Sequence, residues 1–207
     1  AMAVLRTLEE SGPLHLVDVQ TRAGLPRSTA HRLIWALEQH GLVRRLDSGA
    51  FALGWALVGL GRAAALSSPL LEAAPDILED LRRRTGESVQ LYVREGDNRR
   101  CVLSLESPHG LRWIVPEGAL LPLDLGSAGR ILAGADVSRT GWLASVEERE
   151  AGVASVSVPV HGPTGDVVAA LSVSGPIERL SRKPGDRHGT SVVKAARALE
   201  RAMRIGH

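Results

Sequence analysis

The 207-residue sequence contains a single cysteine, Cys101, so no disulfide can form within the chain. A lone thiol is typical of proteins that work in a reducing compartment. The chain also lacks a run of about 18 apolar residues, the length that a membrane-spanning helix needs, and it has no signal-like start. We therefore expect a soluble protein of the cytoplasm.

Motifs that carry common catalytic chemistry are missing as well. There is no GxxxxGK[ST] phosphate loop, and the seven histidines and one cysteine show no metal-ligand spacing. Gly126-Ser127-Ala128-Gly129 resembles the nucleophile elbow of hydrolases. That motif needs glycine two residues before the serine, and position 125 is Leu. The charged run Glu147–Glu150 could supply carboxylates, yet such a run is more typical of a solvated loop. We expect no enzyme activity, no metal and no cofactor.

The chain has no large excess of charge of either sign. Its 25 lysines and arginines stand against 23 aspartates and glutamates, which gives a net charge of +2 and excludes a generally basic protein. Within residues 26–46, however, Arg27, Arg32, Arg44 and Arg45 stand against one glutamate, Glu38. Contact with DNA phosphates requires a local basic patch of this kind rather than a high net charge.

The stretch Leu16–Leu42 has the pattern of two helices joined by a tight turn. A short apolar pattern ends at Gly24, which can take the left-handed conformation that closes a helix. Pro26 is suited to the start of the next helix, which the spacing predicts from Arg27 to His40.

The second predicted helix has one apolar and one polar face. Its apolar residues recur at helical spacing and form one buried stripe: Ala30, Leu33, Ile34 and Leu37. The side chains left facing outward are Arg27, Ser28, Thr29, His31, Arg32 and Trp35. A helix that enters the DNA major groove by its N-terminal end needs this arrangement. A helical hairpin whose polar face is only solvated would show the same pattern.

A short basic hairpin is predicted after the two helices. Residues 42–46 predict a basic strand, 47–50 a turn and 51–54 a second strand, and the whole makes a winged helix. The run GLPRSTAHRLIWALEQHGLVRR, followed by FALG, resembles the DNA-binding domain of the IclR family of bacterial transcription regulators. We predict that the wing residues Arg44 and Arg45 hold phosphates or reach the minor groove. The residues predicted in or beside the major groove are Arg27, Ser28, Thr29, His31 and Arg32.

The remaining chain predicts a second domain of helices and strands. Residues 57–66 are small and apolar and predict a linker helix, either packed on a second subunit or serving as a plain connector. A longer helix opens at Pro69, the apolar period changes to two from Ser88, and an amphipathic helix ends the chain. The predicted strands are a hairpin over 89–105, Leu111–Val115, Val153–Val160 and Val167–Ser174.

Strands bracketed by helices indicate an α+β domain with an antiparallel sheet. This order of elements resembles the C-terminal effector domain of the IclR family, which is similar to GAF and PAS ligand-binding domains. TGESVQLY and EREAGVASVSVPV resemble an actinobacterial branch near regulators of amino-acid biosynthesis. The predicted parts are a winged helix-turn-helix DNA-binding domain over 1–56, a linker helix over 57–68 and an effector-binding domain over 69–207.

Serines with strand spacing mark a candidate ligand site. Ser172 and Ser174 share one face of a predicted strand. Ser155 and Ser157 likewise share one face of the neighbouring predicted strand. Ser127-Ala128-Gly129 begins a predicted helix, where free amides attract anions. Hydroxyls that meet such amides suit a small carboxylate. Alternatively, the serines simply face water.

The resemblance implies specific ligand contacts. In the effector domains of the family, small organic acids bind the amides of the loop that matches Ser127-Ala128. The position matching Ser145 is an Asp in some members and the one matching Ser155 is a Cys, so this site would carry less negative charge. Trp113 and Trp142 could wall the pocket or belong to the core. The implied ligand-binding residues are Ser127, Ala128, Ser145, Val153, Ser155, Ser172 and Ser174.

One departure from the family affects the cover of this site. Members carry a longer, largely helical segment between a helix like Ser127–Gly134 and a Gly-Trp pair like Gly141-Trp142, whereas only Ala135–Thr140 joins them here. Either this protein has a true deletion, or the printed sequence skips a mobile loop that the protein has. In the family this segment helps to cover the pocket.

Together these patterns predict a transcription regulator, most often a repressor in this family. Its partners would be near-palindromic operator DNA, a second copy of itself in a dimer or tetramer, and a small organic acid or related metabolite. The alternative is a small-molecule sensor that acts through protein partners and keeps a vestigial DNA-binding domain. Sequence-specific DNA binding distinguishes the two.

Overall fold

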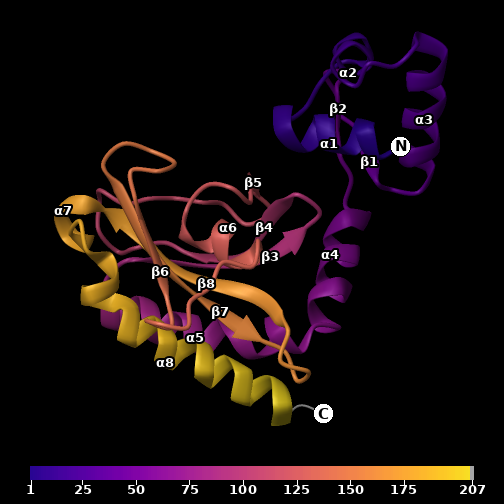
Figure 1. Cartoon of the computed structure of the whole chain (residues 1–207). Coiled ribbons are helices and arrows are strands. Elements are labelled where there is room, and N and C mark those ends of the chain that lie inside the picture. The colour runs from indigo at the N-terminus through magenta and orange to yellow at the C-terminus, as the bar shows by residue number, and fades with distance from the viewer. Residues whose placement is uncertain (206–207) are drawn as a thin grey trace. The chain divides into compact units, whose positions relative to one another are not determined.

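A computed structural model describes residues 1–205 of the chain (Figure 1). The chain folds as two compact units that divide between Ser67 and Ser68, and each unit is described by itself. Helices and an antiparallel sheet make the fold α+β, as predicted. None of the helices within residues 1–205 is long and apolar enough to cross a membrane.

The N-terminal unit is a helix-turn-helix with a wing, which confirms the prediction. Its elements are α1 (Met2–Ser11), α2 (Leu16–Arg22), α3 (Arg27–Gln39), β1 (Val43–Arg45), β2 (Phe51–Leu53) and α4 (Ala56–Leu66). The helices α1 to α3 and strand β1 each turn one apolar face inward and share a single core. The buried members of that core are Val4, Leu8, Val19, Ile34, Leu37 and Val43.

A tight turn sets the start of α3. Gly24 has a φ of 64°, a left-handed conformation that only glycine adopts without strain. Leu25 N–H donates to the Gln20 carbonyl across the turn at 2.9 Å. Pro26 follows with a φ of −58°, and α3 begins at the next residue. The order Gly, Leu, Pro therefore determines where the second helix starts and which residues occupy its first turn.

The helix α4 has no buried residue. Val58, Leu60 and Leu66 are all exposed, and open space surrounds Gly59 and Gly61. Exposed apolar side chains in a row usually mark a surface that another chain covers. The predicted linker helix is present, and its contact with a second subunit stays a prediction.

The C-terminal unit is built on a six-stranded antiparallel sheet with the strand order β5-β4-β3-β8-β7-β6. Ser68 caps the first helix of the unit, and Gly86 ends that helix in a left-handed conformation. The helices are α5 (Pro69–Thr85), α6 (Ser127–Leu132), α7 (Ile177–Leu180) and α8 (Pro184–Ile205). The strands are β3 (Ser88–Glu95), β4 (Asn98–Leu105), β5 (Leu120–Pro122), β6 (Leu143–Val146), β7 (Val153–His161) and β8 (Val167–Pro176).

The two faces of this sheet have different partners, because successive strand residues point to opposite sides. Leu171 and Val173 of β8 point into the main core, where the sheet packs on α5 and α8. Tyr92 of β3 and Ala170 of β8 belong instead to a second core with α6. Figure 1 shows α5 and α8 along one side of the sheet and α6 on the other. The pattern predicted correctly that Leu171 and Val173 would face the core.

The predicted strand Leu111–Val115 is wrong. The segment is irregular, and side chains hold it: the Ser88 hydroxyl donates to the Trp113 carbonyl at 2.7 Å, and Val115 is buried in the second core. The outer edge of β4 is taken instead by β5, which pairs with residues 98–100. The strands β5 and β6 and the helix α7, of three or four residues each, were not predicted.

Candidate functional sites

The polar face of α3 is largely exposed. Arg27, Ser28, His31 and Arg32 are exposed and Thr29 is half-buried. Within the described residues 1–205, the side chains of Arg27, His31 and Arg32 make no hydrogen bond or ion pair. The helix also has no side-chain cap and no acidic residue in its first turn, so its first amide groups remain open to a phosphate.

The hairpin β1–β2 carries the two predicted wing arginines on different sides. Arg44 is half-buried, with its guanidinium 4.8 Å from the ring centroid of Trp55. Arg45 is exposed and lies over Phe51 at 5.7 Å. Because neighbouring strand residues point to opposite faces, the two cations cannot approach one phosphate in the same way. Arg45 is the freer of the two.

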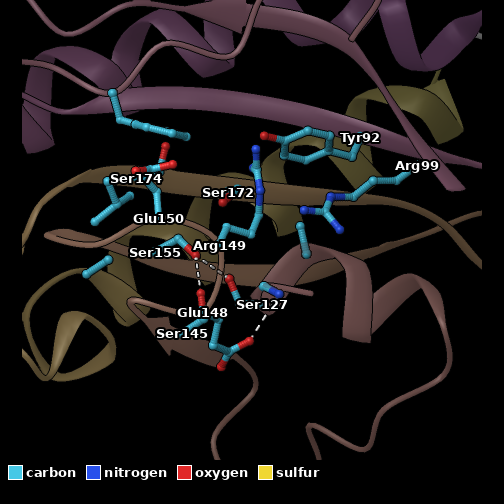
Figure 2. A pocket seen from close by; sticks show the side chains of 15 residues that line it. Tyr92, Arg99, Ser127, Ser145, Glu148, Arg149, Glu150, Ser155, Ser172 and Ser174 are labelled. Atoms are coloured by element: carbon cyan, nitrogen blue, oxygen red, sulfur yellow. Dashed lines mark hydrogen bonds between the residues drawn. The ribbon is translucent and has the colours of Figure 1, made fainter. Parts of the chain in front are cut away.

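One pocket of the C-terminal unit brings together all of the predicted ligand residues (Figure 2). It lies between the serine-bearing face of β7 and β8, the start of α6, and the turn between β6 and β7. The predicted residues in its lining are Ser127, Ala128, Ser145, Val153, Ser155, Ser172 and Ser174.

The serines of this pocket bond to one another rather than to bulk water. The Ser127 hydroxyl lies 2.8 Å from the Ser155 oxygen and 2.7 Å from the Ser157 oxygen. Ser145 reaches Ser155 at 2.8 Å, and Ser157 donates to Ser172 at 2.9 Å. The alternative that these serines simply face water is wrong. A hydroxyl can donate or accept, so this network can turn toward either type of ligand atom.

Sequence reasoning missed a buried cation and the ring beside it. Arg99 is 2% exposed, and its guanidinium donates to the carbonyls of Pro122 and Leu125, the latter at 2.7 Å. It lies 5.4 Å from the ring centroid of Tyr92. Burial lowers the pKa of Arg99 and raises the pKa of the Tyr92 phenol, so the phenol stays protonated. Arg99 lies two residues before Cys101 on β4, so both side chains point to the same buried side of the strand. This spacing could have indicated that Arg99 is buried.

The turn between β6 and β7 also enters the pocket. Glu148, Arg149 and Glu150 line it, so the interpretation of this run as only a solvated loop is wrong in part. The Glu148 carboxylate accepts from Gly126 N–H at 3.0 Å and pairs with the Arg130 guanidinium at 3.0 Å. The backbone N–H of Gly126, just before α6, is therefore already bonded to a carboxylate of the protein, that of Glu148.

The two tryptophans have different roles. Trp113 lines the pocket, with the Arg149 guanidinium 5.7 Å from its ring centroid. Trp142 instead packs against the main core and into a notch on α8. A Cβ at Gly189 would lie 2.5 Å from Trp142 Nε1, so the notch needs glycine. Trp142 therefore belongs to the core, whereas Trp113 both lines the pocket and packs against the second core.

Comparison with known sequences identifies both halves of the chain. The model of the IclR helix-turn-helix domain matches residues 1–47, and the model of the IclR C-terminal domain matches 63–138 and 133–201. The transcriptional repressor IclR of Escherichia coli K12 is 25% identical over 92% of this chain and 83% of its own length. The glycerol operon regulatory protein of Streptomyces coelicolor is 29% identical over 100% and 95%.

The same family appears among solved structures. An IclR regulator from Alicyclobacillus acidocaldarius superposes with a TM-score of 0.86 at 22% identity, over 97% of this chain and 95% of that one. An IclR homologue from Microbacterium hydrocarbonoxydans in complex with 4-hydroxybenzoate gives a TM-score of 0.83 at 24% identity, over 99% of each chain. These structures share the fold.

The expected missing segment can now be located. The C-terminal model matches in two pieces that meet at residues 133–138, within and beside the short connector. The alignment with the Streptomyces coelicolor protein spans 242 positions against 207 residues here, so at least 35 positions have no counterpart. With both of its domains matched, the chain belongs to the IclR family of bacterial transcriptional regulators and is a DNA-binding regulator.

Proposed function

We propose that this regulator reads operator DNA with α3 in the major groove. The observation that carries the proposal is the exposed face of α3, on which Arg27, His31 and Arg32 lack partners within residues 1–205. Arg27 and Arg32, which no acid neutralises within residues 1–205, are available for guanine edges and phosphates. Ser28 and Thr29 would contact the backbone beside them, and Arg44 and Arg45 would hold phosphates from the wing.

The regulator would act as a two-fold dimer, or as a tetramer built from such dimers. The uncovered apolar side chains of α4 support a contact between copies of the linker, 57–68. A dimer of DNA-binding domains, 1–56, would read a near-palindrome with half-sites about one helical turn or a multiple of it apart. Repression is favoured because several relatives are named repressors.

The effector domain, 69–207, would bind a small organic acid in the serine-lined pocket. The hydroxyl network and the buried cation Arg99 support an oxygen-rich anion, and a relative of the same fold is complexed with 4-hydroxybenzoate. Binding would change operator affinity by a coupling free energy of about 1–3 kcal/mol. No catalysis is proposed, since the hydroxyl partners of Ser127 are serines and none of the histidines within residues 1–205 lines the pocket. A regulator of this kind works in the bacterial cytoplasm.

The DNA contacts can be tested before an operator is known. Binding of the whole protein to a labelled random duplex is measured over a salt series. Arg45→Ala should reduce the slope of log affinity against log salt by about one unit. Arg201→Ala, an exposed cation of α8, is the matched control and should leave the slope unchanged. Equal slopes for all three proteins would contradict the wing contact.

The pocket can be tested by calorimetry with a panel of small organic acids, 4-hydroxybenzoate included. Ser172→Ala and Ser174→Ala should weaken whichever acid the wild type binds, because each removes a hydroxyl from the lining. A variant that binds the same acid with unchanged affinity would exclude its serine from the site.

A further inference from the structure

The serine-lined pocket has almost no free room. The space inside it that the centre of a water-sized sphere can reach is about 30 Å³, against about 150 Å³ for an engineered cavity that binds benzene. Even a small carboxylic acid needs several times that space. Something that now lies in the pocket must therefore move before an acid can bind.

The charged tip of the β6–β7 turn fills the space. In Figure 2, Glu148 points to the backbone amide before α6, and Arg149 extends between the serines and Tyr92. The Glu148 carboxylate is held from two sides, by Gly126 N–H at 3.0 Å and by Arg130 at 3.0 Å. Arg149 packs so closely that a Cβ at Gly126 would lie 3.3 Å from its Cδ.

The base of this turn is anchored, whereas its tip remains accessible. Glu147 accepts from Gly152 N–H at 3.1 Å and pairs with Arg182 at 3.0 Å, and Ile177 N–H donates to the Gly152 carbonyl at 2.9 Å. The Glu148 side chain, by contrast, keeps 32% of its surface exposed. A tip that swings out would lose the two Glu148 contacts while the base stays in place.

We infer that Glu148 is an internal competitor for the effector pocket. Its carboxylate holds the Gly126 amide at the wall of the pocket, and an external carboxylate binds there by displacing it, so the strength of the Glu148 contacts limits effector affinity. The identity of the external ligand as a carboxylate rests on the proposed function; the closed pocket does not. Hydrogen bonds to a charged acceptor are stronger than those to a neutral one, so removal of the charge should favour displacement.

The test compares Glu148→Gln with Glu178→Gln in the full chain. Both variants lose one negative charge from the C-terminal unit, but Glu178 is exposed on α7, does not line the pocket and does not anchor the turn. The amide resonance of Gly126 is followed by NMR, first without ligand and then in a titration with acetate as the probe. Glu148→Gln should shift the free Gly126 amide and tighten acetate binding about tenfold. Glu178→Gln should do neither.

Each outcome discriminates. A Gly126 amide that is the same in Glu148→Gln and the wild type overturns the internal contact, whatever the protein binds. A shifted amide with equal acetate affinities in all three proteins overturns the competition. Acetate that binds none of them refutes the carboxylate pocket of the proposed function and the competition, while the ligand-free shift still reports whether Glu148 closes the pocket. Equal tightening by both variants would show a general charge effect and overturn the specific role of Glu148.

Discussion

Gly129 of α6 has the closest backbone packing at the pocket, and its replacement has a calculable effect. A Cβ there would lie 2.9 Å from the Leu123 carbonyl carbon, and closer still to the Leu123 oxygen and to Arg99 Nη1. Alanine would gain about 1 kcal/mol of helix propensity over glycine. Overpacking costs about 1–3 kcal/mol, and the upper end applies because a backbone atom cannot rotate away. We expect Gly129→Ala to destabilise the unit by about 2 kcal/mol.

The assay is thermal unfolding followed by circular dichroism and calorimetry. A loss of this size should lower the melting temperature of the C-terminal unit by about 5 °C. Gly110→Ala is the matched control, because nothing lies within 4 Å of its Cβ position, and it should change stability by less than about 0.5 kcal/mol. A Gly129→Ala protein that melts at or above the wild-type temperature would refute the close seating of α6 on Leu123 and Arg99.

Three further predictions concern other parts of the molecule. Arg27→Ala should weaken binding to a selected operator by about 1–3 kcal/mol and relax the preference at one position; equal losses on selected and random duplexes would reduce Arg27 to a phosphate contact. Burial raises the pKa of the Cys101 thiol to about 12, so at pH 8 only about one molecule in ten thousand carries the thiolate. Iodoacetamide should therefore modify Cys101 in denaturant and not in the native protein, as mass spectrometry can check. Arg179→Met should cost about 3 kcal/mol, because Glu87 is 3% exposed and accepts hydrogen bonds from Arg179 at 2.6 and 2.8 Å; unchanged urea unfolding would contradict that.

The sequence pattern was sufficient where one rule governed a long element. Period 3.6 placed α3 and its apolar stripe, and Gly24 with Pro26 marked where it starts. Period 2 placed β7 and β8 and put Ser172 and Ser174 on the face opposite Leu171. The family resemblance then named pocket residues from distant segments, which no local pattern could bring together.

The pattern failed where tertiary contacts decide. Leu111–Val115 has a strand-like composition, but β5 occupies the edge that it would have needed. A hydrogen bond from the Ser88 side chain and the burial of Val115 hold it instead. Arg99 was not singled out at all, yet strand β4 carries it inward, where it is 2% exposed. Glu148 looked solvated because nothing local indicates that Gly126, 22 residues away, presents its amide. Such long-range pairings leave no periodic trace in a single sequence.

The most direct test of the account is selection of bound duplexes from a random DNA pool, with the wild type and the double variant Arg27→Ala/Arg32→Ala side by side. The account predicts a near-palindromic motif that the wild type enriches and the double variant loses. No enrichment by the wild type at moderate salt, with or without organic acids, would contradict the reading of DNA by α3. A motif that survives in the double variant would place recognition elsewhere on the protein.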